Sequence, residues 1–293
     1  MTETKYGIVA GYDGSECGEQ ALKWAIEEAR LRRTRLTICH LWQYPYTGLM
    51  VPVGMEFEQA AEHMLLDAVA GARTEAPDVE IRPLLMCGSA ARNLIDVGSD
   101  ADLVVVGTHG LSGVRALMLG SVSSQVAMHS VSPVIVVRGR PDLSPESYPG
   151  QIVVGADGSP AADRALAVAF EEAQLRGLPL TAVCAWTRPD KDASRALYID
   201  QDGLRTLAGE RFHDAVDRLR DTYPGVKAVA ELTDAPVIEA LQAAAASAQL
   251  LVLGSRGVGF VRGRLLGSVS QTMLHQSPCP VAIVHAPETV PVS

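Results

Sequence analysis

The feature that most constrains this chain is an internal repeat. Residues 11–15, which read Gly-Tyr-Asp-Gly-Ser, return as Gly-Ala-Asp-Gly-Ser at residues 155–159, an offset of 144 positions. Residues 107–123 match residues 254–270 at nine of 17 positions, with an offset of 147. Because motifs that recur at nearly constant spacing indicate a duplicated structural unit, we expect two copies of one domain.

The extent of each copy predicts the domain organisation. We expect a first domain over residues 1–138, a linker over residues 139–150 and a second domain over residues 151–293. The linker carries three prolines, which is typical of segments between domains. Each copy has a length close to that of a common single domain.

Short apolar runs alternate with helical apolar faces in both copies, which predicts the fold class. In the first copy we expect strands at residues 6–12, 35–42, 79–86, 103–107 and 133–138, and helices at 16–32, 57–69, 90–97 and 120–130. In the second copy we expect strands near Gln151, Leu180, Val226, Leu250 and Val281. Nearly continuous apolar strands that alternate with helices favour a parallel sheet covered on both faces. We therefore predict an α/β protein with two repeated, doubly wound, Rossmann-like domains.

Composition restricts the class of protein. The hydrophobic fraction of 47% is enough for a buried core, and a net charge of -9 argues against a nucleic-acid partner. The five cysteines form no Cys-x-x-Cys pair, so we expect neither a disulfide framework nor a zinc cluster, and we infer a reducing compartment. No apolar stretch is long enough to span a membrane and residues 1–6 lack a signal-peptide core, so we expect a cytoplasmic protein.

Doubly wound sheets bind ligands beyond the carboxyl ends of their strands, where the winding reverses. This rule selects Asp13 after the first strand and residues 107–121 after the fourth. In the second copy it selects Asp157 and residues 254–268. For both aspartates an Asx turn into the next helix is the alternative to a contact with ribose hydroxyls or a base. Their position beside the reversal point favours the ligand contact.

The loop after the fourth strand reads Gly107-x2-Gly110-x9-Gly120-Ser121 and recurs as Gly254-x2-Gly257-x9-Gly267-Ser268. Glycine admits a ligand close to the backbone, and the helix that starts after the last glycine offers free N–H groups to an anion. The dipole of such a helix contributes about 0.3–1 kcal/mol. Arg115 and Arg262 can reach the same anion. The alternative, that these glycines only close turns and cap a helix, is disfavoured because the spacing recurs in both copies.

On these motifs the chain resembles the universal stress protein family in its tandem two-domain form, over residues 5–138 and 151–286. The resemblance implies a five-stranded parallel sheet in each domain, ATP at the strand ends and pairing of the domains through their last strands. By motif, the implied ATP-site residues of the first copy are Gly11, Asp13, Leu41, Val106, Gly107, Gly110, Arg115, Gly120, Ser121, Val122 and Ser123. Those of the second copy are Gly155, Asp157, Ala185, Leu253, Gly254, Gly257, Arg262, Gly267, Ser268, Val269 and Ser270.

The resemblance also suggests a division of roles within each site. The aspartate contacts the nucleoside, the glycines and Ser121 or Ser268 hold the phosphates, and backbone near Leu41 and Val106 frames adenine. Mg²⁺ commonly accompanies a bound triphosphate, but the sequence names no metal ligand.

No catalytic residue can be named from the sequence. A Walker lysine is absent, so no motif-borne cation stabilises charge on a leaving phosphate. His109 aligns with Arg256, which argues against a catalytic histidine shared by the copies. We therefore expect a nucleotide-dependent regulator or sensor that acts on an unknown protein partner. A slow ATPase or phosphotransferase is the alternative, and a nucleotidyl transferase and a scaffold that ignores nucleotide are the other hypotheses.

The last predicted strand of each copy is an apolar edge strand, which favours pairing between strands. We expect the two copies to form an internal pseudo-dimer through these strands, and we leave a further homodimer open. Residues 43–54 and 187–202 differ between the copies and are candidates to close over the pockets or to form partner surfaces.

Overall fold

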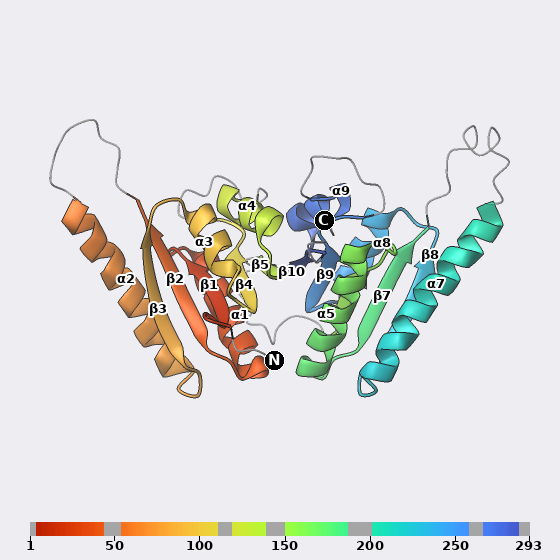
Figure 1. Cartoon of the computed structure of the whole chain (residues 1–293), viewed down its shortest axis with the longest axis horizontal. Coiled ribbons are helices and arrows are strands. Elements are labelled where there is room, and N and C mark those ends of the chain that lie inside the picture. Colours follow the sequence, from red (N-terminus) through yellow and green to blue (C-terminus); the bar gives the residue numbers. More distant parts are fainter. Residues whose placement is uncertain are drawn as a thin grey trace, which may run out of the picture. The chain divides into compact units, whose positions relative to one another are not determined.

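The computed structural model describes residues 4–43, 54–110, 119–138, 150–186, 201–257 and 266–286. The chain divides into two compact units, Met1–Ser147 and Tyr148–Ser293. Each unit has its own parallel sheet and its own helices (Figure 1). The predicted arginines of the site, Arg115 and Arg262, and most of the two variable segments lie outside the described residues.

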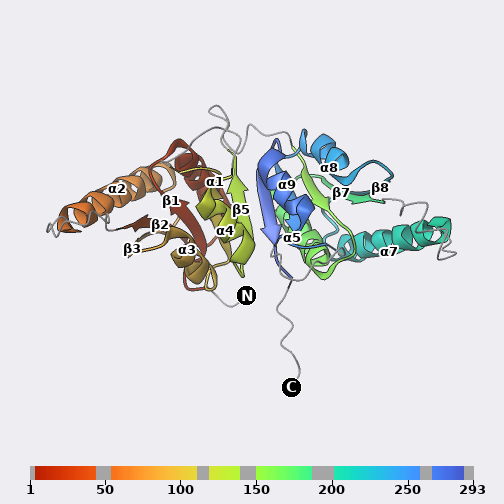
Figure 2. The same ribbon diagram turned by 90° about the horizontal axis from the view of Figure 1, so that it is seen from above.

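The first unit is a five-stranded sheet with the order β3-β2-β1-β4-β5, in which all neighbours are parallel. Its strands are β1 (Ile8–Tyr12), β2 (Leu36–Trp42), β3 (Ile81–Cys87), β4 (Leu103–Gly107) and β5 (Val134–Val137). Its helices are α1 (Glu16–Arg32), α2 (Gly54–Glu75), α3 (Ala90–Gly98) and α4 (Ser121–His129). Figure 2 shows α1 and α2 on one face of this sheet and α3 and α4 on the other, which confirms the doubly wound fold.

The second unit repeats this plan, with the strand order β8-β7-β6-β9-β10. Its strands are β6 (Ile152–Gly155), β7 (Leu180–Ala185), β8 (Ala228–Thr233), β9 (Leu250–Gly254) and β10 (Val281–Val284). Its helices are α5 (Pro160–Arg176), α7 (Gln201–Thr222), α8 (Val237–Ala245) and α9 (Ser268–Gln276). The largest departure from the predicted bounds is α2, which extends beyond residues 57–69 at both ends. Other bounds in the first unit differ by at most two residues, and the strand expected near Val226 begins at Ala228.

Local chemistry explains where the first helix of each unit begins and ends. The Ser15 hydroxyl accepts a hydrogen bond from the Gly18 N–H at 3.1 Å and caps α1, as Ser159 caps α5. Both helices end on a residue with left-handed backbone, which is Gly177 at φ 64° in α5 but Arg33 at φ 51° in α1. Glycine adopts that conformation without strain, so the two copies reach one geometry with different residues.

A buried ion pair recurs in the same helix of both units. In α5 the fully covered Glu172 accepts a hydrogen bond from Arg176 Nε at 3.1 Å. In α1 the buried Glu28 faces Arg32 at 3.3 Å and accepts from Trp24 Nε1 at 2.9 Å. Such a pair stabilises a fold little more than apolar side chains of similar volume would, but the loss of one partner leaves an uncompensated buried charge.

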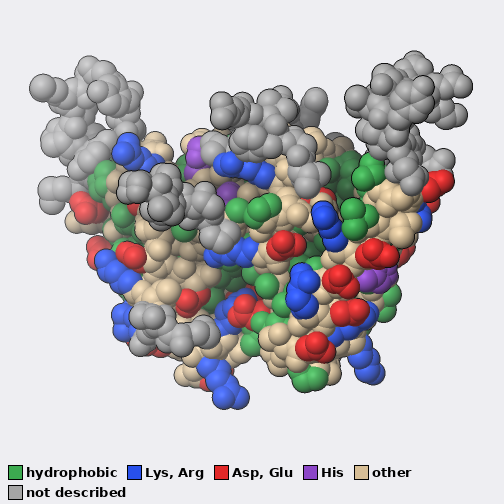
Figure 3. Space-filling view, turned by 45° about the vertical axis from the view of Figure 1, so that its right-hand side comes forward, with side chains coloured by type: hydrophobic (Ala, Val, Ile, Leu, Met, Phe, Trp, Pro, Cys, Tyr) green, Lys and Arg blue, Asp and Glu red, His purple; other side chains and the backbone are tan. Residues whose placement is uncertain are grey.

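Basic and acidic side chains are interspersed on the face drawn in Figure 3, rather than gathered by sign. Among the described residues, none of the helices is both long and apolar enough to cross a bilayer. The pairing of the two copies through their last strands stays a prediction.

Candidate functional site

A cavity lies at the carboxyl ends of the strands in the first unit. Its volume is about 530 Å³, and its walls come from the ends of β1, β2 and β4, the loop after β4 and the first turns of α3 and α4. Ten of the predicted site residues line it: Gly11, Asp13, Leu41, Val106, Gly107, Gly110, Gly120, Ser121, Val122 and Ser123. The structure therefore brings together residues that are separated by more than 100 positions in the sequence.

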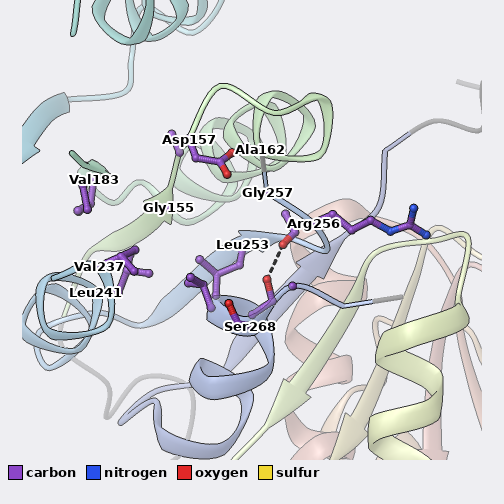
Figure 4. Close-up of a pocket in the computed structure, with 16 residues that line it drawn as sticks. Gly155, Asp157, Ala162, Val183, Val237, Leu241, Leu253, Arg256, Gly257 and Ser268 are labelled. Carbon is purple, nitrogen blue, oxygen red and sulfur yellow. Dashed lines mark hydrogen bonds between the residues drawn. The ribbon is translucent and has the colours of Figure 1, made fainter. Parts of the chain in front are cut away.

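The second unit has a corresponding cavity, with a volume of about 210 Å³ (Figure 4). Ten predicted residues line it as well: Gly155, Asp157, Ala185, Leu253, Gly254, Gly257, Gly267, Ser268, Val269 and Ser270. The two cavities use matching positions of the repeat, as the alignment of the copies predicts.

Each loop is held to the helix that follows it. In the first unit the Gly120 N–H donates to the Thr108 carbonyl at 2.6 Å, and the Ser123 hydroxyl donates to the Gly107 carbonyl at 2.5 Å. The N-cap residue Gly120 supplies no side-chain cap, so the first-turn N–H groups of α4 at Ser121 and Val122 face the cavity without one. This arrangement suits an anion, because these N–H groups carry the positive end of the helix dipole.

The second unit repeats these bonds around α9. The Gly267 N–H donates to the Ser255 carbonyl at 2.7 Å, and the Ser270 hydroxyl donates to the Gly254 carbonyl at 2.7 Å. Since the Ser123 and Ser270 hydroxyls already fasten helix to strand, Ser121 and Ser268 are the serines whose hydroxyls lie exposed beside the cavity.

The first glycine of each loop has a packing role that the sequence did not suggest. A Cβ added to Gly107 would lie 2.5 Å from the Cys17 carbonyl oxygen, and one added to Gly254 would lie 2.8 Å from the Ala161 carbonyl carbon. These atoms belong to the backbone of the first turns of α1 and α5. The glycine therefore lets the helix approach the end of the strand closely, and the expectation that it also leaves room for a ligand stays a prediction.

Both aspartates make the Asx turn that we weighed as the alternative to a ligand contact, and both also line the cavities, so the ligand contact stays a prediction. Asp13 Oδ1 accepts from the Ser15 N–H at 3.0 Å and from its hydroxyl at 2.6 Å, which is an Asx turn around Gly14 at φ +77°. The same carboxylate lines the cavity, and a Cβ on Gly110 would overlap its Oδ2 atom. The turn therefore orients the carboxylate, and Gly110 leaves space for it.

Asp157 has the same arrangement in the second unit. Its Oδ1 atom accepts from the Ser159 N–H at 3.0 Å, and a Cβ on Gly257 would overlap its Oδ2 atom. The second glycine of each loop is thus explained by the aspartate, which is a contact that sequence spacing alone does not show.

His109 and Arg256 occupy matching positions but differ in setting. His109 Nδ1 lies 3.1 Å from the Thr108 hydroxyl, and its Nε2 atom is buried with no hydrogen-bond partner among the described residues. Burial, and then the charge of Arg138, lower the pKa of His109, which favours the neutral ring. In Figure 4 the Arg256 guanidinium is directed away from the cavity.

Sequence reasoning missed the apolar walls. They include Ala90 and Leu94 from α3 in the first cavity, and Val237 and Leu241 from α8 in the second. The signal was available, because the helix after the third strand begins at the same edge of the sheet as the binding loop. Tyr12, Gly18 and Gln43, and in the second unit Ala156, Ala162 and Val183, were also missed.

The two ends of each cavity differ in chemistry. One end is apolar, formed by Leu41, Leu94 and Val106 in the first unit, and the other offers helix N–H groups and a carboxylate. A planar apolar group and an anionic group joined by a hydroxyl-bearing segment match this order. Within the described ranges there is no group of three or more His, Cys, Asp and Glu side chains that could hold a metal ion.

Comparison with known proteins gives a consistent family. Residues 7–138 and 150–285 each match the model of the Universal stress protein family. Universal stress protein Rv2623 of Mycobacterium tuberculosis is 32% identical to this chain, over 94% of the chain and 95% of that protein. A universal stress protein of Mycolicibacterium smegmatis is 33% identical over 97% and 98% of the two chains. A solved universal stress protein from Archaeoglobus fulgidus superposes with a TM-score of 0.69 at 20% identity, covering 96% of this chain and 97% of that one.

Proposed function

The chain belongs to the universal stress protein family, and from that premise we propose that each domain binds one ATP molecule and that the protein is a nucleotide-dependent regulator. One observation carries this proposal. In both domains an apolar wall, an oriented aspartate and an uncapped helix N-terminus line a single cavity. These are groups that can receive the base, the ribose hydroxyls and the phosphates of a nucleotide.

The roles within each proposed site follow from these groups. Adenine packs at the apolar end, the carboxylate of Asp13 or Asp157 accepts from ribose hydroxyls, and the first turns of α4 and α9 hold phosphate oxygens. We propose that Arg115 and Arg262 add positive charge beside the phosphates. A bound triphosphate would bring Mg²⁺ with water and phosphate oxygens as its ligands.

The lining of the cavities favours retention of the nucleotide over its turnover. Among the described lining residues neither cavity has a lysine, and the second has no histidine. Both aspartates accept hydrogen bonds in Asx turns, and we propose that their carboxylates receive ribose hydroxyls rather than act as general bases beside the phosphates. Among the described lining residues, each domain therefore offers helix N–H groups that can bind a phosphate, but the two domains share no lysine or histidine that could promote attack on it.

The proposal is tested with a charge placed at the phosphate end. Ser121→Asp and Ser268→Asp put a carboxylate on the first residue of α4 and α9, where both serines are exposed. An acidic residue there stabilises the helix but repels a phosphate. We expect the wild type to release adenine nucleotide on denaturation and to bind two ATP by isothermal titration calorimetry. The double variant should fold and bind none, and the control variants Ser121→Thr and Ser268→Thr should bind normally.

Absence of adenine nucleotide after purification, together with no heat of ATP binding, would overturn the proposal. Equal ATP binding by the wild type and the double Asp variant would also overturn it.

A slow ATPase or phosphotransferase is the second candidate, favoured by the unpartnered Nε2 atom of His109 beside the first cavity. It predicts sustained release of phosphate that is lost in His109→Gln. Equal residual rates in the wild type and this variant would contradict it. The unknown protein partner, and the pairing of β5 with β10, remain parts of the proposal that the family resemblance supports.

A further inference from the structure

The two cavities differ at their apolar ends although the repeat builds both. Four matched positions form these ends: Leu41, Ala90, Leu94 and Val106 in the first domain, and Ala185, Val237, Leu241 and Leu253 in the second. Both sets hold two leucines, one alanine and one valine, but in the second domain the larger side chains Leu253 and Val237 are on β9 and α8, which form the inner wall, and the smaller Ala185 is on β7. The volumes are about 530 Å³ and about 210 Å³.

Leu253 closes the inner wall of the second cavity. A Cβ placed on Gly155 would lie 2.7 Å from Leu253 Cδ2, whereas one on Gly11 would lie 3.1 Å from Val106 Cγ1. The longer Leu253 side chain therefore packs closer to β6 than Val106 packs to β1.

Val237 adds to this effect from the other side. It lines the cavity from the first turn of α8 where the first domain has Ala90, and in Figure 4 it lies with Leu241 at the same end as Val183. The compensating change, Ala185 for Leu41, opens space on β7, at the outer side of the cavity. A base in the second domain must therefore sit further from the inner wall and bury less of its surface.

Resting on the proposed function, we infer that the two sites are unequal: the first domain holds ATP more tightly, and Val237 and Leu253 set the lower affinity of the second. The phosphate ends share their helix and loop bonds and differ at His109 and Arg256, whose guanidinium is directed away from the second cavity, so we assign the difference to the base pocket. Nucleotide occupancy then has two thresholds, and the second domain empties first as ATP falls. Changes of one or two methyl groups in an apolar pocket alter affinity by about 10-fold to 200-fold.

The experiment measures each site alone in the full chain. Ser268→Asp silences the second site and Ser121→Asp the first, and calorimetry then gives the ATP dissociation constant of the other. We expect binding at least about 10-fold weaker in Ser121→Asp than in Ser268→Asp. Val237→Ala with Leu253→Val, added to Ser121→Asp, should recover about 10-fold. Ala90→Val with Val106→Leu, added to Ser268→Asp, should lose a similar factor.

Val229→Ala is the matched control, since Val229 is 59% exposed on the edge strand β8 and lies outside both cavities. It should change neither constant. Equal constants for the two sites, or a tighter second site, would overturn the inference and leave the proposed function intact. Failure of ATP to bind at either site would instead refute the proposed function. Hydrogen exchange of α8 and β9 for the second-domain variants, and of α3 and β4 for the first-domain variants, checks that each variant is folded, so that loss of binding is not read from an unfolded domain.

Discussion

Two glycine-to-alanine changes in the second cavity should separate stability from ATP binding: Gly254→Ala should lower the stability of the domain, and Gly267→Ala should lower its affinity for ATP. Gly254 and Gly267 both line the second cavity and both recur in the repeat. A Cβ on Gly254 would lie 2.8 Å from backbone atoms of Ala161 and Ala162, which no rotation of a side chain can relieve. Overpacking of this kind costs about 1–3 kcal/mol, so Gly254→Ala should destabilise the second domain by that amount.

Gly267→Ala meets a different environment. The backbone there has φ -70° and ψ 156°, which alanine adopts freely, and the nearest atom to the new Cβ is the Ser255 oxygen at 3.6 Å. Alanine is a poorer N-cap than glycine by roughly 0.5–1 kcal/mol, and the smaller entropy of the unfolded chain offsets about 0.4–1 kcal/mol. Stability should change by less than about 0.5 kcal/mol. The methyl group, however, stands 3.7 Å from the Gly257 nitrogen, among the N–H groups proposed to hold phosphate.

The assay separates fold from binding. Hydrogen exchange of α5 and β9 reports the local free energy of unfolding, and calorimetry in the Ser121→Asp background reports ATP affinity at the second site alone. We expect Gly254→Ala to lower protection, and Gly267→Ala to keep protection while weakening ATP by at least about 10-fold, or about 1.4 kcal/mol. If Gly254→Ala is as stable as the wild type, the packing argument is wrong. If Gly267→Ala binds ATP normally, the N-terminus of α9 does not hold the phosphates.

Three further predictions follow from the described contacts. Glu172→Ala leaves Arg176 buried without its carboxylate and should destabilise the second domain by about 3–5 kcal/mol, measured by hydrogen exchange; a change under about 1 kcal/mol would contradict a buried pair. Burial raises the pKa of the Cys39 thiol to about 12. Iodoacetamide at pH 8 should therefore alkylate the exposed Cys87 in the native protein and spare Cys39, which peptide mass spectrometry measures. Modification of both cysteines at equal rates would contradict this prediction. The pKa of His109 lies below its ordinary value of 6.5, so the neutral ring stabilises the fold above that pH, and this contribution is lost as the pH falls. In urea titrations, His109→Gln should therefore lose less stability than the wild type between pH 7 and pH 5. Equal losses of stability in the two proteins would refute this.

The sequence predicts the fold well because the repeat and the apolar runs constrain it twice. The predicted bounds of Glu16–Arg32 and Leu103–Gly107 equal the observed bounds of α1 and β4. Both elements end at strong local signals: a serine cap and a left-handed residue for the helix, and a glycine for the strand. The bounds of α2 were less accurate, since its last turn carries exposed polar side chains such as Arg73 and Glu75, which extend no apolar pattern.

The site is a harder case, because sequence spacing gives positions and not neighbours. It selected residues that the structure gathers into one cavity, including Asp13 and Gly110. It did not show that Gly110 accommodates the Asp13 carboxylate, or that Gly107 accommodates the backbone of Cys17. Both contacts join segments about 90 or more positions apart, so only the three-dimensional structure reveals them.

These contacts change what the repeated glycines mean. A recurring motif suggests one shared cause, yet here the first glycine serves helix packing and the second makes room for a carboxylate. A Cβ on the third would lie 3.0 Å from the Thr108 oxygen at Gly120 but 3.6 Å from the Ser255 oxygen at Gly267. Because two of the three are required by the fold, intact glycines in both copies do not by themselves imply equal nucleotide binding. Affinity is then set by residues outside the motif, such as Val237 and Leu253, which can vary without disturbing the loop. A duplicated domain can in this way keep its architecture while its two sites diverge in the concentration of nucleotide to which they respond.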